Sequence, residues 1–184
     1  MAIYERWNEV KVSDAAKQIG VSTKSASRCF DELEYLNIDV LGMKGKSRVI
    51  NIPSDRKQVW QQIENVLRNP VIRRFVLRED MKLEKKAGIS ALCEYSLLSD
   101  NVYPTYAVTK KELKDSAVKV EKQVSELEEI GCVVLELGYF IDFLGKGFQD
   151  PLSVILSLTG EEQEEERVDI SINEMLEEYV WSKD

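Results

Sequence analysis

The stretch VSDAAKQIGVSTKSASRCFDELEYL, which covers residues 12–36, carries the clearest structural pattern in the sequence. Its first part predicts a short helix, with Ser13 as a suitable N-cap and an acidic residue in the first turn. Gly20 can then end this helix in a left-handed conformation, and Ser22 can cap a second helix. Between them, we expect Val21 to fill the core where the two helices meet.

The second helix is predicted from Thr23 to Leu36, because apolar residues recur there at helical intervals. They form one stripe that we expect to be buried, made of Ala26, Cys29, Phe30, Leu33 and Leu36. The first helix has a matching apolar side in Ala15, Ala16 and Ile19. Two helices joined by a three-residue turn form the helix-turn-helix layout.

The opposite face of the second helix is polar and basic at its N-terminal end. The residues there are Thr23, Lys24, Ser27 and Arg28. DNA-binding helices present their N-terminal residues to base edges in the major groove, where arginine can bind guanine and lysine can neutralise phosphate. The solvated face of an ordinary surface helix has the same composition, and Arg28 could instead pair with Asp31 or Glu32 on its own helix.

A β-hairpin is predicted next, with strands at Ile38–Met43 and Ser47–Ile52 and with Gly45 available for a positive φ in the turn. Three cations crowd the tip of this hairpin: Lys44, Lys46 and Arg48. A hairpin in this place is the wing of a winged helix-turn-helix, and cations on it can bind the phosphate backbone. We therefore predict DNA contacts by Ser22, Thr23, Lys24, Ser27, Arg28, Lys44, Lys46 and Arg48.

This region resembles the winged helices of bacterial MarR-like regulators, in which a Gly-aliphatic-Ser turn, a Ser-Arg pair and a Glu-Leu-Glu run recur. Here these are Gly20-Val21-Ser22, Ser27-Arg28 and Glu32-Leu33-Glu34, and the resemblance covers about residues 10–52. It implies that the second helix is the recognition helix. Ala2–Glu9 leaves little room for the first helix usual in that family, which indicates either a short first helix or a trimmed chain.

Charge divides the sequence into two parts, although the chain as a whole carries a net charge of −8. Residues 1–78 hold 14 Lys and Arg against nine Asp and Glu, whereas residues 79–184 hold 11 against 24. A basic part joined to an acidic part suggests a nucleic-acid-binding module with a second domain of another role. Acidic surfaces that only keep a protein soluble would give the second part the same composition.

Composition also excludes several kinds of chemistry. The 184 residues contain no histidine, and the three cysteines, Cys29, Cys93 and Cys132, are far apart. This rules out a His-based triad and argues against a disulfide framework or a zinc site, so we expect no metal and no cofactor. The longest apolar run is too short to cross a membrane, and residues 1–10 show no signal peptide, which favours a cytoplasmic protein.

A connecting helix is predicted over Pro53–Asn69, with Ser54 as its cap, and the proline after Asn69 ends it. We therefore divide the chain into residues 1–69, the winged helix-turn-helix with its connecting helix, and residues 70–184, an acidic α+β domain. The basic, strand-like piece Arg73–Arg78 could contact nucleic acid, but pairing with the acidic domain is the favoured interpretation.

The second domain is predicted to mix strands and helices. The expected fold is therefore α+β, an N-terminal winged helix-turn-helix followed by a mixed α/β C-terminal domain. The predicted strands are Tyr103–Val108 and Cys132–Tyr139, and the predicted helices are Gly88–Leu98, Lys110–Ser116, Pro151–Leu158 and Ile172–Trp181. Val120–Glu129 is a charged stretch with one apolar edge, and Thr159–Arg167 is expected to be an acidic loop.

Several short motifs resemble, in the same order, bacterial winged-helix proteins of the AbiEi type, the antitoxins of type IV toxin–antitoxin systems. The motifs are Leu67–Val71, Ala87–Tyr95, Pro104–Val108, Asp150–Leu158 and Glu166–Val168. The resemblance implies an N-terminal DNA-binding domain for autorepression and a C-terminal domain that opposes a nucleotidyltransferase-like toxin. Most of these residues are apolar, so we expect them to form the core and assign none of them to a site.

The leading hypothesis is a DNA-binding transcriptional regulator, an autorepressing antitoxin whose partners are double-stranded operator DNA and a cognate toxin. A protein-interaction module, in which the winged helix binds protein instead, is the alternative. An enzyme is disfavoured, because Glu136, Asp142 and Lys146 could be pictured as a degenerate nuclease centre but their spacing fits no known motif. The sequence leaves the oligomeric state open, with a homodimer as one option.

Overall fold

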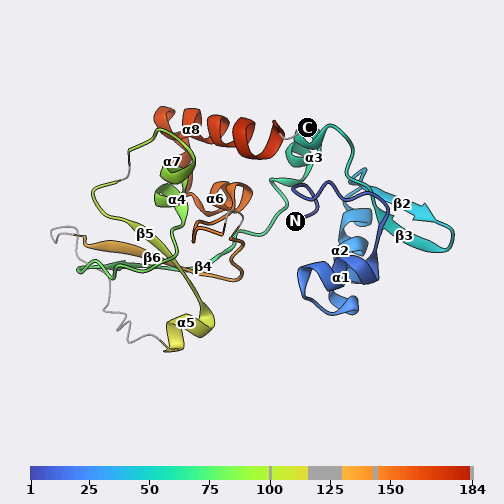
Figure 1. Cartoon of the computed structure of the whole chain (residues 1–184), viewed down its shortest axis with the longest axis horizontal. Helices are drawn as coiled ribbons and strands as arrows, with labels where there is room; N and C mark the ends of the chain where they lie inside the picture. Colours follow the sequence, from blue (N-terminus) through green and yellow to red (C-terminus); the bar gives the residue numbers. More distant parts are fainter. Residues whose placement is uncertain (100, 116–129, 143–144, 183–184) are drawn as a thin grey trace. The chain divides into compact units, whose positions relative to one another are not determined.

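The computed structural model describes residues 1–99, 101–115, 130–142 and 145–182 (Figure 1). These residues form a mixed α+β protein that divides into two compact units, Met1–Leu67 and Arg68–Asp184. The division falls two residues before the expected boundary between residues 69 and 70. Each unit has its own sheet and its own core.

The first unit combines helices with a three-stranded antiparallel sheet. Its elements are β1 (Val10–Lys11), α1 (Val12–Ile19), α2 (Thr23–Tyr35), β2 (Leu41–Lys44), β3 (Ser47–Ile50) and α3 (Arg56–Ile63). β3 lies in the middle of the sheet, with β1 and β2 on either side. Trp7, Ala15, Phe30 and Ile50 form the core, so α1, α2 and the sheet close around one cluster.

The turn between α1 and α2 has the predicted backbone geometry. Gly20 ends α1 with a φ of 76°, and the Ser22 hydroxyl accepts a hydrogen bond of 3.1 Å from the Ser25 amide at the start of α2. The start of α1 differs from the prediction, because Ser13 lies inside the helix and the N-cap is Lys11. β1 pairs with β3 and continues directly into α1, so the strand sets where the helix begins.

The junction of α1 and α2 buries smaller side chains than predicted. Val21 was expected in the core but is 43% exposed, and Ile19 is 49% exposed. Ala15 and Ala16 are buried instead. Residues this small let two helices approach closely, and a close approach leaves no space for a larger side chain from the turn.

The stripe on α2 is also narrower than predicted. Ala26 and Phe30 are buried and Leu33 is partly buried, whereas Cys29 and Leu36 are exposed. The buried residues follow a single row along the helix, because the small core of this unit covers only part of the helix surface. The helix itself ends at Tyr35, one residue before the predicted end.

The hairpin and the connecting helix are present but shorter than predicted. Gly45 begins the turn between β2 and β3 with a φ of 64°, a conformation that glycine adopts without steric cost. In α3, the cap is Asp55 and not Ser54, because the Asp55 carboxylate accepts a 3.0 Å hydrogen bond from the Gln58 amide. The helix ends at Ile63, well before Asn69.

The second unit contains a three-stranded sheet with helices packed against it. Its elements are β4 (Val71–Leu77), α4 (Gly88–Tyr95), β5 (Thr105–Thr109), α5 (Lys110–Asp115), β6 (Cys132–Leu137), α6 (Pro151–Ser157), α7 (Gly160–Glu164), α8 (Glu166–Leu176) and a π-helical turn (Glu177–Trp181). β6 lies in the middle, antiparallel to β4 and parallel to β5. Every residue of β6 is buried, as its apolar sequence predicted.

Both faces of this sheet carry apolar side chains. On one face, Val133 and Leu135 of β6 pack with Ala107 of β5, and on the other, Val134 packs with Tyr106. A further cluster joins α4, α6 and α8 through Ile89, Leu92, Val154, Val168 and Met175. Among the described helices, none has both the length and the apolar character that a bilayer crossing requires.

Some expectations for this unit are wrong, and others concern residues outside the described ranges. Thr159–Arg167 is helical and not a loop, because Thr159 and Glu162 form a reciprocal capping box that begins α7. α8 therefore starts at Glu166, six residues before the predicted start of the last helix. The charged stretch Val120–Glu129 and the predicted last residue of the α5 helix, Ser116, lie outside the described residues.

Candidate nucleic-acid interface

The N-terminal half of α2 presents polar and basic side chains to solvent. Thr23, Lys24 and Arg28 are exposed, and Ser27 is half-buried. The Ser22 hydroxyl makes two contacts with Ser25. It accepts the hydrogen bond of the Ser25 amide at the helix cap, and it lies 2.9 Å from the Ser25 hydroxyl. The helix thus has one face in the core and one basic face in water, as the sequence predicted.

Three cations of this region are available to a ligand. Within the described ranges, Lys24, Arg28 and Lys46 make no ion pair and no side-chain hydrogen bond. The alternative expected for Arg28, a pair with Asp31 or Glu32, is therefore not formed. Asp31 is engaged by Arg48 instead.

Arg48 of β3 binds three side chains of α2. Its Nη1 lies 2.6 Å from Asp31 Oδ1 and 3.1 Å from Glu34 Oε2, and its Nη2 donates to Ser27 Oγ at 3.2 Å. The guanidinium carbon is 6.0 Å from the centroid of the Phe30 ring. The hydrogen bond to Asp31 is the main reason why the pKa of Arg48 is raised above its usual range.

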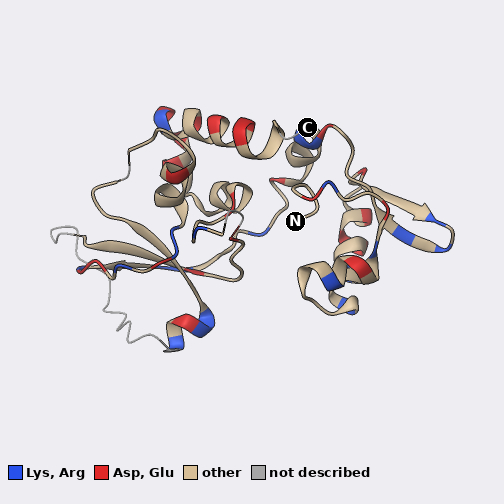
Figure 2. Ribbon diagram, viewed as in Figure 1, with Lys and Arg blue, Asp and Glu red and all other residues tan. Residues whose placement is uncertain are grey.

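Lys44, the other predicted cation of the hairpin, forms an ion pair with Glu9. Glu9 has a positive φ of 53°, and its amide donates a 2.6 Å hydrogen bond to Asn51 Oδ1, which fixes its backbone beside β3. The pair is about half exposed on both sides, so solvent screens it and Lys44 can exchange partners. Figure 2 shows the Lys and Arg residues along this hairpin in blue.

The eight predicted contact residues thus fall into two groups. Thr23, Lys24, Arg28 and Lys46 are exposed and bind no other side chain of the described residues, whereas Ser22, Ser27, Lys44 and Arg48 each contact another side chain of the unit. Sequence reasoning missed the partners Glu9, Asp31 and Glu34. The spacing of Ser27, Asp31 and Glu34 along one row of a helix was the available signal, because such a row can meet one arginine from a neighbouring strand.

The difference in net charge between the two parts of the chain is smaller when the charges are counted by structural unit. Residues 1–67 hold ten Lys and Arg against nine Asp and Glu, and residues 68–184 hold 15 against 24. The four arginines that made the first part basic, Arg68, Arg73, Arg74 and Arg78, belong to the second unit. The first unit is therefore nearly neutral, and its basic character is local to the N-terminal half of α2 and to the hairpin.

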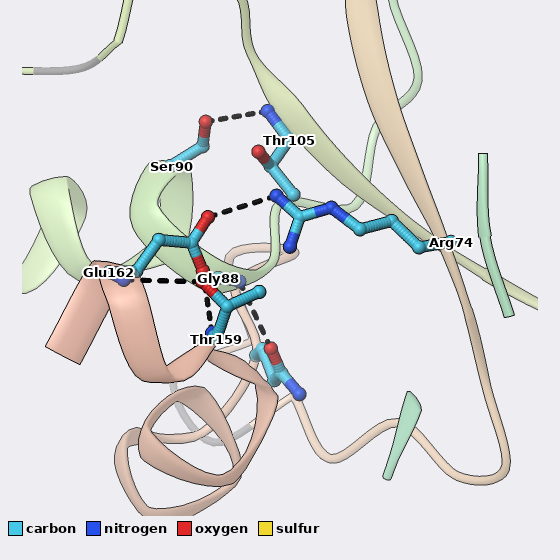
Figure 3. Close-up of polar contacts among 7 residues, drawn as sticks. Arg74, Gly88, Ser90, Thr105, Thr159 and Glu162 are labelled. Atoms are coloured by element: carbon cyan, nitrogen blue, oxygen red, sulfur yellow. Dashed lines mark hydrogen bonds and ion pairs between the residues drawn. The ribbon is translucent and has the colours of Figure 1, made fainter. Parts of the chain in front are cut away.

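The arginines of β4 bind carboxylates of the second unit. Arg74 Nη2 donates to Glu162 Oε1 at 2.9 Å, and the Thr159 amide donates to the other carboxylate oxygen at 2.8 Å (Figure 3). Burial alone would raise the pKa of Glu162, but these donors outweigh it and lower the pKa below its usual value. Arg73 pairs with the buried Glu136 of β6 in the same way. The favoured interpretation of Arg73 and Arg74, pairing with the acidic domain, is confirmed.

A second set of polar contacts in Figure 3 lies inside the unit. Ser90 Oγ accepts a 2.7 Å hydrogen bond from the Thr105 amide, and the Gly88 amide donates to Gln149 Oε1 at 3.3 Å. Gln149 also donates to Ser157 Oγ at 2.7 Å. These groups satisfy one another and join α4, β5 and α6, which is a structural role.

The catalytic alternative gains no support from the geometry. Glu136 is buried and bound to Arg73, and the Asp142 carboxylate accepts hydrogen bonds of 3.0 Å from the amides of Lys146 and Gly147. Both oxygens of this exposed carboxylate are thus engaged by backbone amides. In the part of the chain that the structure describes, no three His, Cys, Asp or Glu side chains come together as a metal site would require.

Comparisons with protein-family models, with curated proteins and with solved structures found no match to this chain.

Proposed function

We propose that this protein binds double-stranded DNA through a winged helix-turn-helix formed by α1, α2 and the β2–β3 hairpin. The observation that carries the proposal is the basic face of α2, on which Lys24 and Arg28 are exposed and have no partner among the described residues. A helix that presents such side chains at its N-terminal end can enter the major groove, where Arg28 would reach a base edge.

The hairpin supplies the second contact. Lys46 lies in the turn between β2 and β3, exposed and without a partner in the described ranges, and Lys44 is held only by an exposed ion pair with Glu9. A cation at this point can bind the phosphate backbone while α2 reads the groove. The proposed contact set is Ser22, Thr23, Lys24, Ser27, Arg28, Lys44 and Lys46, with Lys24, Arg28 and Lys46 as the main binding cations.

The biological role proposed with this activity is transcriptional regulation, as an autorepressing antitoxin. The support is the resemblance of the motifs in both units to AbiEi-type antitoxins, together with the separate acidic second unit. In this role the first unit binds the operator, and the second unit acts on a cognate toxin without contributing to DNA binding. The protein would not be an enzyme.

DNA binding can be tested by fluorescence anisotropy with a duplex from the region upstream of the gene. The double variant Lys24→Ala/Arg28→Ala should lose most of the affinity, because both main cations of α2 are removed. Lys111→Ala/Lys114→Ala is the matched control, since it removes the same charge from exposed positions of α5 in the second unit. Absence of binding by the unaltered protein at low salt, or equal losses in both variants, would contradict the proposal.

The protein-interaction alternative predicts a different result in the same experiment. If the basic face of α2 served a protein partner, the unaltered chain would bind random duplexes as weakly as the Lys24→Ala/Arg28→Ala variant. A salt titration then separates the cases, because DNA binding through several cations weakens steeply with salt.

A further inference from the structure

Arg48 differs from the other cations of the candidate interface in how it is bound. Lys24, Arg28 and Lys46 are exposed, whereas the side chain of Arg48 is only 28% exposed and its guanidinium contacts Ser27, Asp31 and Glu34 together. These three side chains lie in one row along α2, at successive turns of the helix. The planar guanidinium has donors in a fixed fork, so it can bind several members of such a row at once.

The contacts of Arg48 join α2 to the hairpin close to the hairpin's turn, beyond the shared core in which Phe30 of α2 packs with Ile50 of β3. Within the described part of the chain, the side-chain hydrogen bonds between α2 and the β2–β3 hairpin are those of Arg48. β1 pairs with β3 only at Val49 and Ile50, so the rest of the hairpin has two strands, and such ribbons are weakly stable by themselves. Without Arg48, the base of the hairpin would stay in the core and paired with β1, but the part near the turn would lose its side-chain hydrogen bonds to the helix.

We propose that Arg48 is a positioning residue, which holds the wing against α2 so that helix and hairpin meet DNA as one rigid surface. The inference rests on the proposed DNA binding and corrects the expectation that Arg48 itself grips phosphate. A phosphate at Arg48 would have to displace the carboxylates of Asp31 and Glu34 and then remain close to both negative charges. Two contact regions in a fixed relation bind more tightly than the same regions joined loosely.

The test compares two variants that change the charge of α2 equally. Asp31→Asn removes the carboxylate nearest Arg48, and Glu32→Gln removes a neighbouring exposed carboxylate that has no ion-pair partner among the described residues. Removing a negative charge near DNA should by itself strengthen binding. We therefore expect Glu32→Gln to bind at least as tightly as the unaltered chain, and Asp31→Asn to bind on the order of tenfold more weakly than Glu32→Gln.

Arg48→Lys provides a second comparison, because lysine keeps the charge and loses the planar fork. If Arg48 positions the wing, Arg48→Lys should lose affinity about as much as Arg48→Ala. If Arg48 binds phosphate, Arg48→Lys should retain most of the affinity and its salt dependence, and Asp31→Asn should bind DNA better than the unaltered chain because it frees the guanidinium. That pair of results would overturn the inference.

Amide hydrogen exchange across β2 and β3 gives a readout that needs no DNA. Asp31→Asn and Arg48→Lys should raise the exchange rates of the hairpin amides, whereas Glu32→Gln should leave them unchanged. If the protein bound no DNA but the exchange rates followed this order, the proposed function would fail while the link between wing and helix stood. If the rates were the same in all variants, the positioning role would be refuted.

Discussion

Arginine serves different purposes in the two units. In the first unit, Arg28 of α2 is exposed and has no partner in the described ranges. In the second unit, Arg73 and Arg74 of β4 bind Glu136 and Glu162, which lie 63 and 88 residues further along the chain. Both arginines of β4 lie in the basic stretch Arg73–Arg78, whose sequence alone is compatible with nucleic-acid binding. The β4 arginines show that a basic stretch of sequence need not be free to bind nucleic acid, because the fold can pair it with distant carboxylates.

The largest contrast between these arginines is expected in stability. Arg73→Ala should lower the free energy of unfolding by about 3 kcal/mol, because the Glu136 side chain is 2% exposed and would keep a buried charge without a counter-ion. Arg28→Ala should change it by less than about 0.5 kcal/mol, since an exposed and unpaired side chain contributes little. Urea unfolding of the two variants measures both values. Equal losses would remove the distinction between the two kinds of arginine.

DNA binding should reverse this order. If Arg28 pairs with a guanine, Arg28→Ala should weaken binding to the operator by roughly 1–3 kcal/mol and binding to random DNA by far less. Arg74→Ala should leave the affinity for both duplexes unchanged, because Arg74 belongs to β4 and binds Glu162. Titrations of both variants against both duplexes measure these effects. Equal losses of Arg28→Ala on the two duplexes would make Arg28 a phosphate contact.

The salt dependence of binding sharpens the comparison further. Lys46→Ala should reduce the slope of log affinity against log salt by about one, because one phosphate contact is lost. Lys111→Ala, an exposed lysine of α5, should leave the slope unchanged. Anisotropy titrations at several salt concentrations provide the slopes. An unchanged slope in Lys46→Ala would place the hairpin tip outside the interface.

The smallest expected effect is on the stability of the folded state at low pH. Glu112 accepts hydrogen bonds from Lys85 and from the Thr109 amide, and these lower its pKa to about 2 from an ordinary value of 4.5. A carboxyl group with a lowered pKa stabilises the folded state above pH 4.5, and this contribution is lost as the pH falls toward 2. Because the side chain is 44% exposed, solvent screening limits the effect to about 1 kcal/mol or less.

Glu112→Gln should therefore reduce the loss of unfolding free energy between pH 5 and pH 2.5, as measured by urea unfolding at each pH. Glu161→Gln is a suitable control, because it removes an exposed carboxylate from the same unit. If both variants altered the pH profile equally, the contacts of Glu112 with Lys85 and Thr109 would not be the cause.

Local chemistry made part of this structure predictable from the sequence. The turn at Gly20, the cap at Ser22 and the central strand Cys132–Leu137 follow from glycine backbone freedom, hydroxyl capping and an apolar run. The prediction that Val21 fills the core was wrong, because burial depends on how closely two helices approach and not on the turn itself.

Contacts between distant residues could not be predicted in the same way. Glu162 as the partner of Arg74 has no signal in the sequence. The row of Asp31 and Glu34 on α2 indicates a place for a cation but does not say that Arg48 fills it, because the folded chain decides which cation reaches these carboxylates. The acidic stretch after Thr159 was predicted as a loop, since glutamates suggested a solvated segment. The capping box and the bond to Arg74 stabilise a helix there instead.

The middle position of β6 also has a consequence for the order in which the chain folds during synthesis. The two strands of the β2–β3 hairpin leave the ribosome almost together, so they can pair at once. β4 has to wait for β6, because the register joins Arg73 to Glu136, 63 residues later. At about 5–20 residues per second, this delay lasts roughly 3 to 13 seconds. During that time Phe75 and Val76 have no strand beside them, and the arginines of β4 are then the charges that discourage pairing with another chain.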